Sequence, residues 1–305
     1  MTHAGLPEIK FALPALPNDL VGRPRLHAAL SAAVAGPLTL VSAPPGAGKT
    51  VTVASWVGAG AAPGPVAWAS LDEGDADRHR FWRLVVAALG LDVAVPRRGD
   101  LSATLDALCH ALSNREEPVV LVLDDFHEVD GCEVVADIDR LLAAAPPAFR
   151  LVVVTRQDPP LRLSRLRLTG RLSEIRQRHL AFTEHEAAQL FKDSGATLAH
   201  EISMLCRRTE GWAAALRLAA LSLRDHPEPE AHVAALAASD QTVADWPVGW
   251  IGRFRRTGAK SFGHRQCRPI ATARDAVDKQ APKRSQAIVH IVEAFRDLKD
   301  ACPGR

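Results

Sequence analysis

The sequence predicts an α/β fold, with a parallel sheet carrying helices on both faces, followed by a smaller all-helical domain and a poorly patterned basic tail. Three observations lead to this prediction. Short apolar runs alternate with amphipathic segments until about residue 180, where the strand-like runs stop. Hydrophobic residues make up 47% and charged residues 24% of the 305 residues, which is typical of globular chains. Residues 241–305 carry a net charge of +7 and the remainder −5, so the composition changes near residue 240.

The first 180 residues divide into an arm and an α/β domain. Residues 1–20 contain three prolines and are expected to form an extended N-terminal arm, and 21–180 form the α/β domain. Continuous apolar runs are typical of strands buried on both faces of a parallel sheet. Such strands are predicted at 38–42, 66–70, 119–123 and 151–154. Amphipathic or alanine-rich segments predict helices at 23–35, 49–57, 78–89, 101–112 and 134–144.

Beyond residue 180 the pattern becomes helical and is then lost. Thr183 followed by Glu186 forms a capping-box sequence, which predicts a helix running to about residue 193. Further helices are predicted at 198–208, 211–224 and 230–238. We therefore expect a helical domain over 181–240, which includes the possible start of a winged-helix domain, and a divergent or truncated basic tail over 241–305.

A glycine-rich loop follows the first predicted strand and opens a helix. Residues 43–50 match the phosphate-binding Walker A pattern, with Ala43 in place of its first glycine. Glycines allow the backbone amides to approach phosphate oxygens closely, and the helix adds the positive end of its dipole. Lys49 is expected to reach the β- and γ-phosphates, and the Thr50 hydroxyl to ligate Mg²⁺. The candidate nucleotide-binding residues of the loop are Pro45, Gly46, Ala47, Gly48, Lys49, Thr50 and Val51.

A second motif is the apolar run 119–123 followed by Asp124 and Asp125, which has the Walker B form. Ligands of parallel sheets bind at the carboxyl ends of the strands, which would place Asp124 beside the phosphate loop as a Mg²⁺ ligand. Asp125 is then placed to orient or deprotonate an attacking water. The alternative is a solvated turn after a strand, where aspartate is common.

Arg156 follows the next apolar run and is a candidate contact of the γ-phosphate, although a plain surface arginine is an equal alternative. No lysine is followed two residues later by aspartate, so the base-reading motif of GTPases is absent and ATP is the expected nucleotide. No apolar run approaches the roughly 20 residues of a membrane-spanning helix, and no secretory signal is visible. We therefore expect no membrane partner and a cytoplasmic location.

Several ordered blocks resemble the large ATP-binding regulators of the LuxR family, which are signal-transduction ATPases with numerous domains (STAND). The similarity extends over about three quarters of the chain, from residue 9 to 238. These ordered blocks are together more specific than the phosphate loop alone. The matching segments are 20–26, 40–50, 66–75 with 81–82, 121–127, 154–160 and 209–212.

The resemblance implies that ATP binding, with slow hydrolysis at most, switches the protein from a closed resting form to a self-associating form under control of an effector. It implies that Val21 and Arg23 lie near adenine and ribose. Gly211 would belong to an element of the helical domain that packs on the nucleotide, although Ala213 stands where the family has proline.

The resemblance stops near residue 240, where the family continues with helical-repeat sensors and a helix-turn-helix. We interpret the basic tail as truncation or divergence, and the alternative is a nucleic-acid-binding tail that contacts DNA weakly and without sequence preference. The alternative function is a stand-alone P-loop enzyme, such as a small-molecule kinase. Its only candidate lid is the arginine-rich stretch 161–171, whose Arg165, Arg167 or Arg171 could also reach a phosphate across an oligomer interface.

Overall fold

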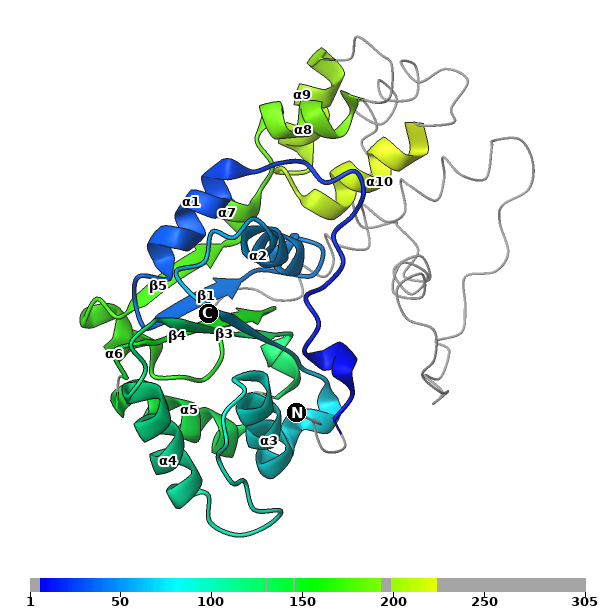
Figure 1. Ribbon diagram of the computed structural model, residues 1–305. Helices are drawn as coiled ribbons and strands as arrows, with labels where there is room; N and C mark the ends of the chain where they lie inside the picture. Colours follow the sequence, from blue (N-terminus) through cyan, green and yellow to red (C-terminus); the bar gives the residue numbers. More distant parts are fainter. Residues whose placement is uncertain (1–5, 130, 145, 193–198, 224–305) are drawn as a thin grey trace. The chain divides into compact units, whose positions relative to one another are not determined.

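The computed structural model describes residues 6–129, 131–144, 146–192 and 199–223, drawn in colour in Figure 1. They belong to two compact units, which divide between Ala181 and Phe182. The helix expected at 230–238 and the basic tail at 241–305 lie outside the described residues.

The first unit contains a five-stranded parallel sheet with the order β2-β3-β4-β1-β5. The four strands expected from the sequence are present, and β5 was missed. Polar and charged residues interrupt its apolar ones, and all but Ile175 are half-buried, so no continuous apolar run marks it. The strands are β1 (Leu38–Ser42), β2 (Val66–Ser70), β3 (Val119–Asp124), β4 (Phe149–Thr155) and β5 (Leu172–Arg176).

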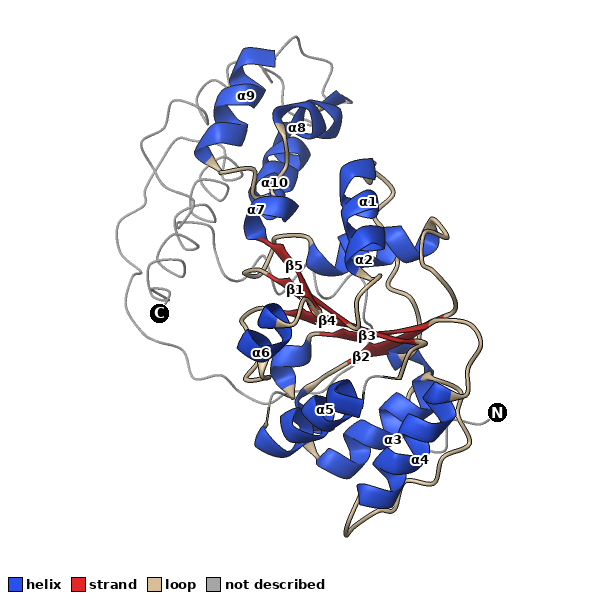
Figure 2. Cartoon of the chain, turned by 90° about the vertical axis from the view of Figure 1, so that its left-hand side faces the viewer, coloured by secondary structure: helices blue, strands red, loops and turns tan. Residues whose placement is uncertain are grey.

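Helices cover both faces of the sheet, as Figure 2 shows. Successive residues of a strand point to opposite faces, so Leu40 joins one core with α3, α4 and α5, whereas Val41 joins a second core with α1 and α2. The α/β fold class is confirmed. The helices of this unit are α1 (Pro24–Ala33), α2 (Lys49–Gly58), α3 (Arg78–Ala88), α4 (Ser102–Ser113), α5 (Cys132–Ala144), α6 (Leu163–Leu168) and α7 (Gln177–Leu180).

The N-terminal segment differs from an extended arm at one point. A 3-10 turn, η1 (Glu8–Lys10), carries Lys10 into the first unit, where its ammonium pairs with Asp75 and lies 2.8 Å from Asp72. Asp75 is fully buried and also accepts a hydrogen bond from Arg80. A buried carboxylate needs cationic partners, so Lys10 fastens the segment to the domain.

The second unit is helical, and its described helices are α8 (Glu184–Leu190), α9 (Ala199–Arg208) and α10 (Ala213–Leu223). The predicted capping box is present: the amide of Glu186 donates to the Thr183 hydroxyl, and the amide of Thr183 donates to the Glu186 carboxylate. Phe191, Leu205 and Leu216 share its apolar core. Across the described ranges, no helix is both long and apolar enough to span a bilayer.

Candidate nucleotide-binding site

The phosphate loop joins β1 to α2, and its glycines adopt the backbone conformations that the motif requires. Gly46 has a φ of 76° and Gly48, at the N-cap of α2, has a φ of 82°. Side chains other than glycine are disfavoured in this region, so the turn depends on glycine at both positions. Pro45 and Gly46 are exposed, Ala47 is buried, and Val51 is half-buried on the first turn of α2.

Lys49 is buried, with 8% of its surface exposed. Its ammonium donates hydrogen bonds to the carbonyl oxygens of Ala43 at 2.7 Å and Pro44 at 3.1 Å. The pKa of Lys49 is lowered to about 8, chiefly by burial and also by the charge of Arg156, while Asp125 and Asp124 oppose the shift. The ammonium therefore lies inside its own loop with neutral hydrogen-bond acceptors, and an anionic ligand would improve its surroundings.

Thr50 and Asp124 meet as the sequence predicts. The Thr50 hydroxyl donates to Asp124 Oδ1 at 2.9 Å, across 74 positions of sequence. Burial, and then the charge of Asp125, raise the pKa of Asp124 to about 6. A hydroxyl and a carboxylate oxygen are ligands that suit Mg²⁺, which takes few protein ligands and completes its shell with water and phosphate. The donor set therefore fits a Mg²⁺-nucleotide.

Asp125 lies in the turn that follows β3, with a φ of 55° and 41% of its side chain exposed. His127 lies close by in η3 (Phe126–Glu128), with its Nδ1 atom 3.9 Å from the Asp125 carboxylate. Both ring nitrogens of His127 are buried and make no hydrogen bond, and Nε2 lies 3.2 Å from a carboxylate oxygen of Glu128. Burial, together with the charge of Arg156, lowers the pKa of His127, so the ring is neutral at neutral pH. No sequence motif assigns a role to His127, and its position after the paired aspartates is the signal that could have found it.

Arg156 is exposed and directly follows Thr155, the last residue of β4. Its charge lowers the pKa of both Lys49 and His127, so it lies within electrostatic reach of the loop and of η3. The structure therefore brings together Lys49, Thr50, Asp124, Asp125 and Arg156.

Val21 and Arg23 are the residues expected near adenine and ribose. Val21 is half-buried. Arg23 is buried and its guanidinium donates to the carbonyl oxygens of Leu180 at 2.7 Å and Ala181 at 2.8 Å. The structure thus places Arg23 at the end of α7, and its role toward the nucleotide stays a prediction.

Gly211 belongs to the second unit and lies between α9 and α10 with a φ of 67°. Its carbonyl accepts a hydrogen bond from the amide of Phe182 at 2.7 Å. Its packing on the nucleotide stays a prediction.

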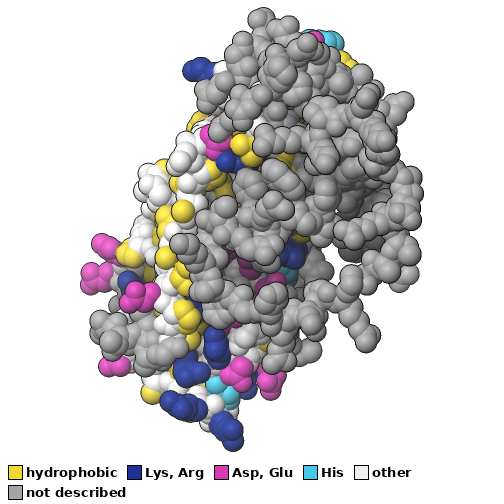
Figure 3. All heavy atoms as spheres, turned by 90° about the vertical axis from the view of Figure 1, so that its right-hand side faces the viewer, with side chains coloured by type: hydrophobic (Ala, Val, Ile, Leu, Met, Phe, Trp, Pro, Cys, Tyr) yellow, Lys and Arg dark blue, Asp and Glu magenta, His cyan; other side chains and the backbone are white. Residues whose placement is uncertain are grey.

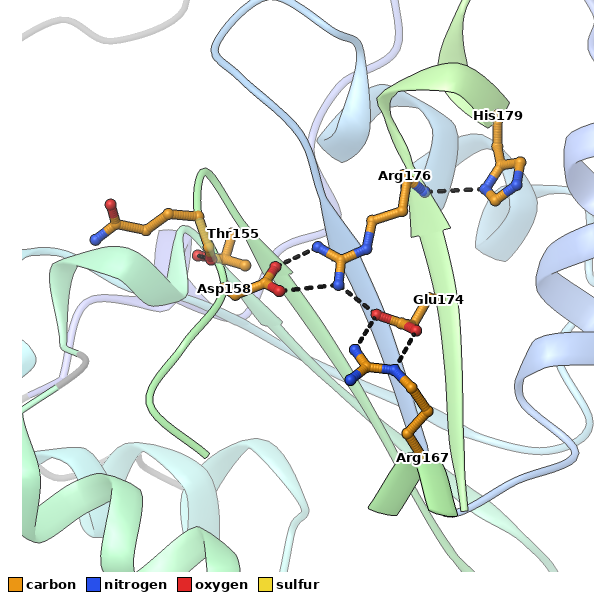
Figure 4. Close-up of polar contacts among 7 residues, drawn as sticks. Thr155, Asp158, Arg167, Glu174, Arg176 and His179 are labelled. Carbon is orange, nitrogen blue, oxygen red and sulfur yellow. Dashed lines mark hydrogen bonds and ion pairs between the residues drawn. The ribbon is translucent and has the colours of Figure 1, made fainter. Parts of the chain in front are cut away.

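A charged network that the sequence analysis missed occupies the end of β5. We call Asp158, Arg167, Glu174 and Arg176 the β5 network (Figure 4). Arg176 pairs with both Asp158 and Glu174, and Glu174 also accepts two hydrogen bonds from Arg167, at 2.9 and 3.0 Å. The network joins a loop, a helix and a strand, so no contiguous motif announces it.

Comparison of the sequence with known proteins identifies relatives of this chain. The HTH-type transcriptional regulator MalT of Yersinia pestis is 34% identical over 228 residues, and that of Serratia proteamaculans is 35% identical over 228 residues. Each match covers 70% of this chain and 25% of the relative. Over this stretch the chain is homologous to MalT. It spans about a quarter of the length of these curated relatives. No profile of a known protein family matches the chain.

Solved structures give more distant likenesses. A STAND protein with a tetratricopeptide repeat sensor from Pyrococcus horikoshii has a TM-score of 0.49 and 15% identity, covering 69% of this chain and 31% of that one. The ORC2 protein of Aeropyrum pernix has a TM-score of 0.47 and 16% identity, covering 76% of this chain and 71% of that one.

Proposed function

We propose that residues 21–180 bind Mg²⁺-ATP and serve as the regulatory switch module of a MalT-like transcription regulator, with slow hydrolysis at most. The observation that carries the proposal is the hydrogen bond between Thr50 and Asp124 beside the buried Lys49. Two distant motifs with the composition of a nucleotide site thereby meet at one edge of the sheet, and the homology to MalT gives the site a regulatory context.

Each side chain has a separate task in this proposal. Lys49 neutralises the β- and γ-phosphates, and the amides of the glycine loop bind their oxygens. Thr50 and Asp124 hold Mg²⁺, which supplies charge neutralisation on the phosphates when bound. Asp125, which is partly exposed, orients the attacking water and accepts its proton. Arg156 contacts the γ-phosphate and thereby distinguishes ATP from ADP.

The regulatory context brings further proposals about partners. Self-association through the ATPase domain, an effector of unknown chemistry and a cytoplasmic location follow from the homology and from the sequence. Contact with DNA is proposed to be weak and independent of sequence, because the +7 charge of residues 241–305 would act on the phosphates, which carry no sequence information. On the face in Figure 3, basic side chains gather at the lower end, and acidic side chains lie beside them.

The alternative of a stand-alone kinase depended on an arginine-rich lid at 161–171. Residues Leu163–Leu168 form the short helix α6 instead. Arg167 on this helix pairs with Glu174, and Arg171 donates to the carbonyl of Leu142. These contacts favour an α6 that is fixed to the domain over a lid, and the regulatory proposal is preferred.

Calorimetric titration with Mg²⁺-ATP tests the proposal. Lys49→Ala should weaken ATP binding at least about tenfold, since a charge-assisted bond of this kind is worth roughly 1.5–3 kcal/mol. The matched control is Arg140→Gln, which removes a cation on α5 that pairs with Asp106. This control should bind ATP like the wild type. Equal affinity in the Lys49 variant and the wild type would contradict the assignment.

A further inference from the structure

The β5 network connects the loop that carries Arg156 to the last residues of the first unit. Asp158 follows Arg156 by two positions, and Arg176 is the last residue of β5. Arg176 is also the β-sheet register partner of Ser42, which immediately precedes the phosphate loop. Both guanidinium Nη atoms of Arg176 bind the Asp158 carboxylate, one of them at 2.9 Å, as Figure 4 shows.

The pair stays charged at neutral pH. The hydrogen bond from Arg176 lowers the pKa of Asp158, and a further hydrogen bond from Ser42 contributes in the same direction. Arg167, and then Arg176, lower the pKa of Glu174 to about 2. Only about a quarter of the Arg176 side chain is exposed. A bidentate pair of this kind constrains geometry as well as charge, because the planar guanidinium matches the carboxylate in one orientation.

The backbone of Arg176 makes a hydrogen bond to α7. Its amide donates to Nδ1 of His179 at 3.0 Å. Burial lowers the pKa of His179, which keeps the ring neutral and able to accept this bond. Arg25 then donates to the carbonyl oxygens of His179 and Ala181, both at 2.6 Å. Through α7, Arg176 is thus connected to the residue at which the first unit ends.

From these contacts we propose that Asp158 and Arg176 are positioning residues that act through Arg156. The pair holds the loop after β4 in the position from which Arg156 meets the γ-phosphate, and it passes a movement of that loop to α7 and Ala181. This inference rests on the proposed function, since it requires ATP at the phosphate loop. It assigns the preference for ATP over ADP, and the response of α7, to an ion pair outside the nucleotide motifs.

Asp158→Asn tests the proposal, because it keeps the shape of the side chain while weakening the pair. Affinities for Mg²⁺-ATP and Mg²⁺-ADP are measured by calorimetry, and protection of the α7 amides by hydrogen exchange with and without each nucleotide. We expect the ratio of ATP to ADP affinity to fall at least about fivefold, which is the lower range of coupling between sites. Affinity for ADP should change less than twofold, and the response of α7 to ATP should be lost.

Arg176→Gln should reproduce this result, and the double variant should be no worse than either single one, because the two residues act as one unit. The control is Asp106→Asn, which weakens an exposed Arg–Asp pair between α4 and α5 and should leave the ratio unchanged. If the wild type prefers ATP and shows the α7 response, and Asp158→Asn does the same, the positioning role is wrong while the proposed function stands. A wild-type chain that binds neither nucleotide would overturn both.

Discussion

The same edge of the sheet carries two groups of charged side chains in opposite electrostatic states. In the phosphate loop and at the end of β3, burial raises the pKa of Asp124 to about 6 and lowers that of Lys49 to about 8. Both shifts favour the uncharged form of the side chain. In the β5 network the pKa of Glu174 falls to about 2 and that of Arg176 rises, away from neutrality.

The difference comes from the partners of each group. Every charge of the β5 network contacts an opposite charge, so the fold favours its ionised form. Lys49 instead donates to a carbonyl oxygen, and Asp124 accepts from a hydroxyl. Burial is therefore the main cause of their pKa shifts. Charges that the fold buries without full compensation mark the place where a charged ligand would bind, whereas fully paired charges hold the scaffold.

The largest effect is expected where chemistry would take place. Asp125→Asn should lower the rate of ATP hydrolysis about 100-fold or more, since general bases contribute roughly 10²–10⁴ to rates. ATP affinity should stay within a few-fold, because the residue acts mainly in the transition state. Single-turnover hydrolysis and calorimetry measure the two quantities. Weak binding combined with normal turnover per bound ATP would refute this role.

The free energy of unfolding of the ligand-free protein should depend on pH through the shifted pKa values of Asp124 and Lys49. The folded pKa of Asp124 lies above its unfolded value, so its contribution to the free energy of unfolding should fall by about 2 kcal/mol as the pH rises from 4 to 7. The pKa of Lys49 is lower in the folded protein than in the unfolded chain, so the free energy of unfolding should rise again between about pH 8 and 10.5. Urea unfolding across this range checks both signs, and a flat profile that is identical in Asp124→Asn would contradict them.

Asp124→Asn should make the ligand-free protein more stable at pH 7, by about 1–2 kcal/mol, because it removes a buried charge and keeps an acceptor for Thr50. The same variant should lose the thermal stabilisation that Mg²⁺-ATP gives the wild type. Thermal melts with ATP, with and without Mg²⁺, measure both effects. Destabilisation of the ligand-free variant would show that the ionised carboxylate is well compensated by the fold.

The smallest effect is expected in the β5 network. Glu174→Gln should lower the free energy of unfolding by less than about 1 kcal/mol at pH 7, because its ion pairs are partly exposed and screened by salt. The depressed pKa means that the stabilisation by Glu174 is present above about pH 4.5 and is lost as the pH falls toward 2. Urea unfolding at low and high salt measures the difference, which should shrink at high salt.

Several parts of the molecule could be predicted from short, contiguous patterns. Strands β1 to β4 follow from continuous apolar runs, and the turn at Gly46 and Gly48 follows from residues that tolerate a positive φ. The capping box of Thr183 and Glu186 is equally local. Other features had no such signal: β5 is a half-exposed edge strand, and Lys10 is fastened to Asp75, which lies 65 positions away.

The order of residues alone predicts the nucleotide motifs, because glycine, lysine, threonine and paired aspartates have the chemistry that such a site needs where a strand and a helix frame them. The charge states and the partners of those groups come from the folded structure. The pKa of Asp124 depends on its burial at the end of β3, and the pairing of Asp158 with Arg176 depends on the loop after β4 reaching the end of β5. Both depend on which residues lie close together in space, which the order of residues along the chain does not specify.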